Sequence, residues 1–342
     1  MKASLIAFTE RGSFLGEKIA EILSQIHWEA ELSCGFGEGK KSLSPWTKKA
    51  FEDSAALIFI GAVGIATRAI APHVKSKAQD PAVIVIDEAA RFVIPILSGH
   101  LGGANELSEK LAKALGASAV ITTATDVNGV FSVDDWARRQ SLLVLNPRAI
   151  KDVSARLLAG EIIKIRSDFP ISGKPPKGVF LTDGEDYDVY ISNENTYKKN
   201  CLKMTAPVCV LGVGCRKGAE VSAIEKAFEE LVLKKDIEEK SIAAVCSIDL
   251  KAEEKGLLDF CKNHNFPFKT FSAEKLMALS GDFTPSNFVK KTTGADNVCE
   301  RSAVLGAGEG ARLTIKKHCL GPVTMALAEK AFSLKFEEGY DE

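Results

Sequence analysis

The sequence lacks the features that would place a protein in a membrane, in an oxidising compartment or on a nucleic acid. Its longest uncharged apolar run, residues 55–66, is too short to cross a bilayer. The formal net charge of the 342 residues is -1, so no overall field attracts nucleic acid. The eight cysteines form no C-x-x-C pair and no zinc-like spacing with histidine. We therefore expect a soluble cytoplasmic protein with free thiols that binds neither nucleic acid nor membrane.

Several catalytic and cofactor motifs are also missing. The sequence has no G-x-S-x-G, which excludes a nucleophile elbow. Gly212 and Gly214 follow an apolar strand pattern, but Gly218 comes one position too late to complete G-x-G-x-x-G. Their loop therefore fits an anion held by backbone amides better than a dinucleotide, and a tight turn without a ligand also fits. Paired carboxylates, a metal cluster or a Ser/His/Asp triad cannot be recognised directly.

What the sequence does contain is an alternation of strand and helix patterns. Residues 3–8 predict a strand, residues 16–26 a helix, and residues 56–60 an uninterrupted apolar strand. Such alternation is typical of an α/β fold in which helices flank mostly parallel sheets. We predict this layered α/β/α architecture for the domains at both ends of the chain.

The same patterns divide the chain into three predicted parts. These are an α/β domain over residues 1–129, a small middle domain with a linker over residues 130–205, and a second α/β domain over residues 206–342. Two weakly patterned stretches, residues 32–42 and residues 192–205, are predicted to be a loop and a linker.

Small and polar residues collect at the predicted carboxyl ends of two strands in the first domain. The strand over residues 92–97 leads into the glycine-rich residues 98–105, and a helix follows. The next strand pattern, residues 119–122, leads into the polar residues 123–128. Because ligands of open α/β sheets bind beyond the carboxyl ends of the strands, this is the predicted location of the chemistry.

Within that stretch, His100 is the one side chain that titrates near neutrality. The neighbouring glycines expose backbone N–H groups that could hold a carboxylate or a developing oxyanion. A structural histidine is the alternative, and Thr123, Thr125 and Asp126 could simply cap the following turn. From the residues alone, the chain is an α/β enzyme or a binding protein for a small anionic ligand.

Two separate sets of motifs carry a resemblance to a known family. The first set consists of GAVGIATRAIAP from Gly61, KxxDPAV from Lys77, SGHLGGANEL from Ser98 and VITTATDVN from Val120. The second set consists of GVGCRKG from Gly212, SIDLK from Ser247, SNFV from Ser286 and TGADNVCERSA from Thr293. The first set resembles the cobalamin biosynthesis protein CbiG, the cobalt-precorrin-5A hydrolase of the anaerobic pathway. The second resembles the carboxyl-terminal domain of that family, which is shared with the CobE proteins.

The resemblance implies a hydrolase that acts on a carbon–carbon bond and needs no cofactor. Water would open the ring A δ-lactone of cobalt-precorrin-5A, and the bridging carbon would leave as acetaldehyde to give cobalt-precorrin-5B. Cobalt would belong to the corrinoid substrate, so no protein-bound metal is expected. Neighbouring methyltransferases of the pathway could make transient contact. The alternative function is that of a non-catalytic carrier of corrinoid intermediates.

For the hydrolase, we expect His100 to act as general base or acid, with Asn105 or Asp126 orienting water or the imidazole. The amides of Gly102, Gly103 and Ala104 would form an oxyanion hole. The macrocycle would be clamped by cations of both end domains. The further residues expected to line the substrate site are Gly61, Gly64, Arg68, Lys77, Ser98, Gly99, Thr123, Thr125, Gly214, Arg216, Lys217, Lys251, Cys299 and Glu300.

Overall fold

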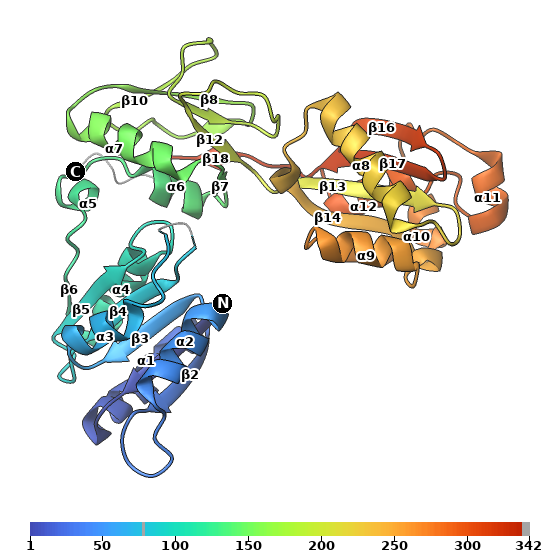
Figure 1. The fold of residues 1–342 in the computed structure, drawn as a ribbon. Helices are drawn as coiled ribbons and strands as arrows, with labels where there is room; N and C mark the ends of the chain where they lie inside the picture. Colours follow the sequence, from blue (N-terminus) through green and yellow to red (C-terminus); the bar gives the residue numbers. More distant parts are fainter. Residues whose placement is uncertain (77–78, 337–342) are drawn as a thin grey trace. The chain divides into compact units, whose positions relative to one another are not determined.

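The computed structural model describes residues 1–76 and 79–336, whose contacts form two compact units. Figure 1 shows their helices and strands along the chain. The units comprise, within the described residues, 1–139 and 150–161 for unit 1, and 140–149 and 162–336 for unit 2.

Unit 1 is built on a six-stranded sheet with the order β2-β1-β3-β4-β5-β6. Neighbouring strands are parallel except for β4 and β5, which pair antiparallel. The strands are β1 (Lys2–Ala7), β2 (Glu29–Cys34), β3 (Ala56–Ile60), β4 (Ala82–Ile86), β5 (Phe92–Leu97) and β6 (Ser118–Ala119). The helices are α1 (Glu10–Gln25), α2 (Leu43–Asp53), α3 (Val63–Ile70), α4 (Ala104–Leu115), α5 (Ala124–Val127), α6 (Val133–Arg139) and α7 (Ile150–Leu158).

Helices cover both faces of this sheet. Ile19 of α1 and Leu111 of α4 pack with Ile58 of β3 in one apolar cluster. Ala66 of α3 packs with Phe59 of β3 in a second apolar cluster, which lies on the opposite face of the sheet. Strands β3 and β4 are buried on both faces, as their uninterrupted apolar runs require. The predicted α/β/α layering is confirmed.

The middle part of the chain forms a five-stranded sheet in unit 2, with the order β10-β8-β11-β12-β7. Its strands, together with the short β9, are β7 (Leu143–Val144), β8 (Ile163–Ser167), β9 (Ile171–Ser172), β10 (Val179–Leu181), β11 (Val189–Ile191) and β12 (Leu202–Thr205). A 3-10 turn, η1 (Pro147–Ala149), precedes α7. Strand β12 lies between β11 and β7, and each of its four residues is buried.

Two predictions of irregular structure are wrong in part. Residues 32–34, predicted to be loop, end the edge strand β2, whose alternating exposure weakens its apolar pattern. Residues 202–205, predicted to be linker, are the buried strand β12. Lys203 gave that stretch a polar appearance, but its ammonium group is inside the protein and donates to the Ser192 carbonyl at 3.0 Å.

The last part of unit 2 is a second α/β domain on a sheet with the order β15-β14-β13-β17-β16. Its strands are β13 (Cys209–Cys215), β14 (Ile242–Ile248), β15 (Phe268–Phe271), β16 (Arg312–Leu320) and β17 (Val323–Glu329), and β18 (Leu334–Lys335) pairs with β9 of the middle part. The helices are α8 (Val221–Lys235), α9 (Lys255–Asn263), α10 (Ala273–Met277), α11 (Asn287–Thr293) and α12 (Cys299–Ala307), with the 3-10 turns η2 (Glu239–Ser241) and η3 (Asp249–Lys251).

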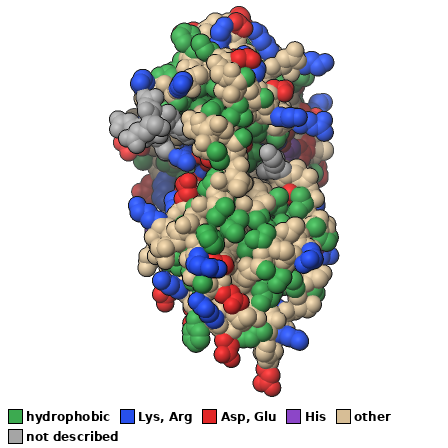
Figure 2. All heavy atoms as spheres, turned by 90° about the vertical axis from the view of Figure 1, so that its left-hand side faces the viewer, with side chains coloured by type: hydrophobic (Ala, Val, Ile, Leu, Met, Phe, Trp, Pro, Cys, Tyr) green, Lys and Arg blue, Asp and Glu red, His purple; other side chains and the backbone are tan. Residues whose placement is uncertain are grey.

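Helices again cover both faces of this sheet. Phe228 of α8 and Phe260 of α9 pack with Leu211 of β13, whereas Ala303 of α12 packs with Val210 on the other face. On the molecular face drawn in Figure 2, basic and acidic side chains are interspersed. No helix among residues 1–76 and 79–336 combines the length and apolar character that a membrane crossing needs.

Candidate active site

The loop between β5 and α4 folds back on itself and presents His100. The Gly103 amide donates to the His100 carbonyl at 2.8 Å, and the Ala104 amide donates to the Ser98 carbonyl at 3.1 Å. Gly103 is the N-cap residue of α4 and has a left-handed φ of 78°, which glycine adopts without strain. A Cβ on Gly99 would lie 2.6 Å from Asn105 Oδ1. The glycines of this loop therefore serve its compact shape.

His100 lies between two carboxylates. Its Nε2 is 2.9 Å from Asp126 Oδ2, and its Nδ1 is 3.3 Å from Asp134 Oδ1. Asn105 donates through Nδ2 to the same Asp126 oxygen at 2.8 Å and to Thr123 Oγ1 at 2.9 Å. The structure thus brings together the three residues predicted to be catalytic, and we call these side chains with Asp134 the His100 cluster.

The charges of the His100 cluster follow from this geometry. Burial acts to lower the pKa of His100, but the hydrogen bonds and charges of Asp126 and Asp134 outweigh it and raise the pKa to about 10. Burial acts to raise the pKa of each aspartate, yet the bond to His100 outweighs it and the pKa of both is lowered. At neutral pH the cluster is an imidazolium between two ionised carboxylates.

Asp134 is the member of the His100 cluster that was not predicted from the sequence. It accepts a hydrogen bond from Ser132 Oγ at 2.8 Å, so its carboxylate is held in place. The signal in the sequence was a pair of adjacent aspartates, Asp134 and Asp135, between Phe131 and the fully buried Trp136. Carboxylates inside an apolar frame are rarely buried without a partner, so the pair indicated a polar cluster.

A second group of ion pairs joins α4 to α6 next to the loop between β5 and α4. Glu106 of α4 and Arg138 of α6 form an ion pair, and Arg138 also reaches Asp135 at 2.9 Å. Burial acts to raise the pKa of Glu106, but Lys110 and Arg138 outweigh it and lower the pKa to about 2. The guanidinium lies against Gly103, where a Cβ would be 3.4 Å away. This pairing fixes α6, and with it Asp134, against the start of α4.

The predicted oxyanion hole is corrected by these bonds. The amides of Gly103 and Ala104 already donate within the loop, so neither is available to a ligand. Of the three predicted donors, only Gly102 has no acceptor within the described part of the chain. A Cβ on Gly102 would lie 2.4 Å from the Cβ of Ser98, so close packing explains this glycine.

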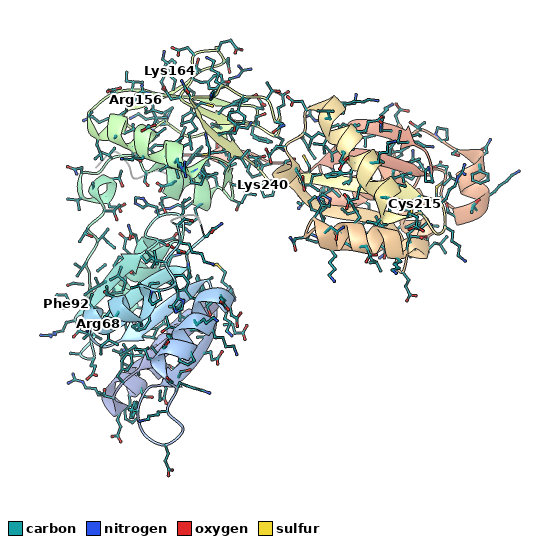
Figure 3. All side chains as sticks on the ribbon, in the orientation of Figure 1. Arg68, Phe92, Arg156, Lys164, Cys215 and Lys240 are labelled. Carbon is teal, nitrogen blue, oxygen red and sulfur yellow. The ribbon has the colours of Figure 1, made fainter. Side chains whose placement is uncertain are left out.

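The other residues predicted to line the site in unit 1 are dispersed. Arg68, labelled in Figure 3, lies exposed on α3, and its Nη1 is 3.3 Å from the Gly64 carbonyl. Gly61 directly follows β3 and has a φ of 155°. Lys77 lies outside the described residues. The remaining members, Ser98, Gly99, Thr123 and Thr125, adjoin the His100 cluster, and Thr125 Oγ1 is 3.4 Å from His100 Nε2.

Two features of these neighbours bear on function. Thr123 makes no side-chain cap to α5 and instead accepts from Asn105, so the capping alternative does not hold for it. Ser98 is 8% exposed and has a left-handed φ of 56°, and its Oγ has no partner among the described residues. A strained, buried serine with an unused hydroxyl is a feature that functional sites tolerate.

In unit 2, the predicted cations lie on the loops that follow β13 and β14. Arg216 and Lys217 are exposed, whereas Lys251 is paired with Glu254 at 2.7 Å. Gly214 is closely packed, because a Cβ there would lie 2.7 Å from Thr324 Oγ1. The exposed pair can still receive a carboxylate, but Lys251 must first leave its partner.

The prediction that Cys299 and Glu300 contact a substrate is corrected. Cys299 is 1% exposed, and burial raises the pKa of its thiol to about 12. Glu300 is fully buried, and its carboxylate accepts from the Thr284 amide, the Thr284 hydroxyl and the Lys317 amide at 2.7–2.8 Å. Both residues hold the start of α12 in the protein interior, out of reach of a ligand.

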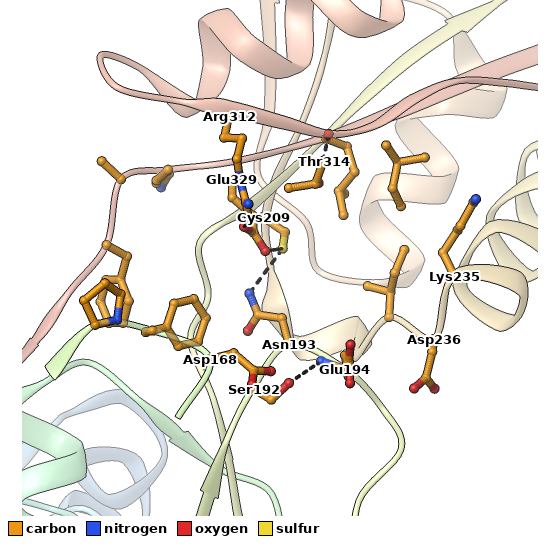
Figure 4. Close-up of a pocket in the computed structure, with 18 of the residues that line it drawn as sticks. Asp168, Ser192, Asn193, Glu194, Cys209, Lys235, Asp236, Arg312, Thr314 and Glu329 are labelled. Atoms are coloured by element: carbon orange, nitrogen blue, oxygen red, sulfur yellow. Dashed lines mark hydrogen bonds and ion pairs between the residues drawn. The ribbon is translucent and has the colours of Figure 1, made fainter. Parts of the chain in front are cut away.

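Unit 2 also contains a cavity of about 760 Å³, drawn in Figure 4. None of the residues predicted to bind substrate lines it. Within it, Asn193 donates to Cys209 Sγ at 3.4 Å, and Glu329 pairs with Arg312 at 3.0 Å. Side chains of both charges line the walls, so the lining favours no particular class of ligand.

Comparison with known proteins places the chain in a family. Residues 45–126 match the family model described as Cobalamin synthesis G N-terminal, and residues 209–328 match Cobalamin synthesis G C-terminus. The cobalt-precorrin-5A hydrolase of Salmonella typhimurium strain LT2 is 32% identical over an alignment of 318 residues that covers 88% of this chain and 91% of that protein. The chain belongs to the cobalamin synthesis G (CbiG) family.

Other members and relatives agree with this assignment. The cobalt-precorrin-5A hydrolase of Priestia megaterium is 29% identical over 359 aligned residues, covering 95% of this chain and 94% of that protein. Protein CobE of a Sinorhizobium species is 29% identical over 123 residues, covering 36% of this chain and 80% of CobE. The resemblance to CbiG and, for part of the chain, to CobE is confirmed.

Membership of the CbiG family gives the His100 cluster its setting. His100, Asn105 and Asp126 lie within the amino-terminal matched region, and Asp134 lies just beyond it. Within residues 1–76 and 79–336, no group of three or more His, Cys, Asp or Glu side chains is arranged to hold a metal ion. The observed contacts of the cluster are those between the imidazole of His100 and the carboxylates of Asp126 and Asp134.

Proposed function

We propose that this chain, a cobalt-precorrin-5A hydrolase by its family, breaks a carbon–carbon bond of its substrate at the His100 cluster. The observation that carries the proposal is the near full-length match to hydrolases of that name, combined with a charged, partly exposed cluster beyond the strand ends of unit 1. Neither observation alone assigns both a reaction and a place for it.

The proposed reaction consumes one water molecule and releases acetaldehyde. Water adds to the carbonyl carbon of the ring A δ-lactone, the acyl–oxygen bond breaks, and the leaving oxygen takes up a proton. The resulting alcohol then loses its proton, the bond from its carbon to the macrocycle breaks, and acetaldehyde departs. The macrocycle keeps the electron pair and is protonated, which gives cobalt-precorrin-5B. No oxidant or reductant is required.

The site supplies what this sequence of steps needs. A carboxylate and an imidazolium can exchange and stabilise charge, and Asn105 fixes the orientation of Asp126. Exposed cations suit the carboxylate side chains of a corrinoid, and the described candidate in unit 1 is Arg68. Cobalt is carried by the substrate in this proposal, and no further cofactor takes part. The eight free cysteines favour a reducing cytoplasm as the place of action.

The proposal is tested by giving the purified protein cobalt-precorrin-5A under anaerobic conditions and trapping acetaldehyde. We expect release by the wild type and a fall in turnover of about 100- to 1000-fold in His100→Asn, as when one fixed stabilising group is lost. The control is His27→Asn, because His27 is exposed at the end of α1 and has a φ of 60° that asparagine tolerates. Binding of the corrinoid without acetaldehyde from the wild type would identify a carrier instead.

A further inference from the structure

We propose that the proton acceptor in this hydrolysis is the carboxylate of Asp126, that His100 remains an imidazolium cation throughout, and that Asp134 is the positioning residue that keeps it so. The inference rests on the proposed function and assigns the roles within its site. It reverses the role expected for the imidazole from the sequence, where His100 was predicted to act as general base or acid.

The first argument is that the imidazole has no nitrogen left for water. Nε2 faces Asp126 Oδ2 at 2.9 Å, and Nδ1 faces Asp134 Oδ1 at 3.3 Å. Each carboxylate oxygen can only accept, so each ring nitrogen must donate. A ring that donates from both nitrogens is protonated and cannot take a proton from water.

The second argument is access. The side chain of Asp126 is 37% exposed, whereas those of His100 and Asp134 are 11% and 10% exposed. Water that enters the His100 cluster therefore meets the Asp126 carboxylate first. Asn105 Nδ2 donates to Asp126 Oδ2, the oxygen that also faces His100 Nε2, and this bond helps to hold the carboxylate in place.

The third argument compares the two possible bases at neutral pH. With a pKa of about 10, His100 would be neutral in only about one molecule in a thousand at pH 7. Asp126, whose pKa is lowered, is ionised in essentially every molecule. A carboxylate is the weaker base, but it is always available and lies where water enters.

The proton balance closes with Asp126 alone as the shuttle. It takes a proton from water as the new carbon–oxygen bond forms, and returns it to the lactone oxygen as the acyl bond breaks. It then accepts the proton of the alcohol as acetaldehyde leaves, and delivers it to the macrocycle. The imidazolium keeps its proton in each step and offsets the negative charge.

Other charged groups near the His100 cluster have to be considered in any pH experiment. On α4, Glu109 interacts with the charge of Asp126, and Glu106 pairs with Arg138 of α6. On α6, Asp135 pairs with both Arg138 and Arg139. Burial, followed by the charge of Asp126, raises the pKa of Glu109. The range from pH 7 to 9 is the informative one, because a carboxylate with a lowered pKa and an imidazole with a pKa of about 10 predict different profiles there.

The test is the pH dependence of acetaldehyde release at saturating cobalt-precorrin-5A, corrected for release without protein. With Asp126 as acceptor we expect the turnover number to stay within about twofold from pH 7 to 9. A neutral His100 acting as base would instead make it rise about 100-fold over the same range, because the neutral fraction grows tenfold per pH unit. A rise of that size overturns the inference, whereas absence of acetaldehyde from the wild type overturns the proposed function.

Two variants separate the roles. Asp126→Asn should lower the turnover number about 100- to 10,000-fold with little change in corrinoid binding, whereas the exposed Asp53→Asn is the matched control. Asp134→Asn removes one acceptor of His100, so the titration of its ring protons in NMR spectra should move to lower pH. Provided that both variants fold, wild-type turnover in Asp126→Asn would contradict the assignment. An unchanged His100 titration in Asp134→Asn would contradict it as well.

Discussion

Gly212→Ala offers a sharp test of how unit 2 is packed. A Cβ at this position would lie 1.8 Å from the Cys299 carbonyl oxygen and 2.8 Å from the Ala303 nitrogen. Both atoms belong to the backbone of α12, so neither can rotate away, and the helix must shift from β13. Overpacking of a core costs about 1–3 kcal/mol and occasionally more, and a collision with backbone belongs at the upper end, about 3 kcal/mol.

The assay can distinguish the two units. All three tryptophans, Trp28, Trp46 and Trp136, belong to unit 1, so their fluorescence reports on that unit, whereas far-ultraviolet circular dichroism reports on both. For about 3 kcal/mol we expect the unfolding of unit 2 to begin about 6–12 °C earlier by circular dichroism. Gly184→Ala is the control, because its Cβ meets one side-chain oxygen at 3.3 Å. Unchanged thermal unfolding of Gly212→Ala by both probes would refute the close approach of α12 to β13.

Two further predictions concern charged side chains in unit 2. His264 bonds to Glu225 and Glu239 at 2.7 and 2.6 Å; burial acts to lower its pKa, but these bonds outweigh it and raise the pKa. Its contribution to stability should therefore be complete below about pH 6.5 and be lost as the pH rises through the folded value, and thermal unfolding of His264→Gln should not show this loss. Burial lowers the pKa of Lys203 to about 8, below its unfolded value, so its charge destabilises the fold at pH 7. In denaturant titrations at pH 7, Lys203→Met should raise the free energy of unfolding by up to about 1–4 kcal/mol. The gain should be smaller near pH 10. A loss of stability at both pH values would show that the bond to Ser192 outweighs the burial of the charge.

The fold was predictable where buried strands produce recognisable apolar runs in the sequence. Residues 56–60 and 82–86 are uninterrupted apolar runs because helices cover both faces of the sheet, and the structure places β3 and β4 there. Strand β12 escaped prediction because one of its four residues is Lys203, whose aliphatic stem and aromatic neighbours make burial possible. A hydropathy pattern does not contain that information.

The His100 cluster was predictable in part for the same kind of reason. His100, Asn105 and Asp126 were expected together because adjacent strand ends meet at one edge of a sheet, and this proximity is present. Asp134 was missed because it reaches the cluster from α6, beyond the predicted boundary at residue 129, whereas unit 1 continues to residue 139. The amides of Gly103 and Ala104 donate inside the loop because of its backbone angles. Those angles could not be predicted from the sequence, because glycine can adopt many backbone conformations.

The pairing of β18 with β9 has a practical consequence for dividing the protein. A fragment that stops after Glu329 would retain every strand of the last sheet, yet it would remove the partner of Ile171 and Ser172 and uncover Phe169, whose ring meets Phe332 at 5.2 Å. The middle part of such a fragment would have an unpaired strand edge at β9 and an exposed aromatic ring. Separate expression of the last domain should therefore begin near residue 206, and any piece that contains the middle sheet should extend through residue 336.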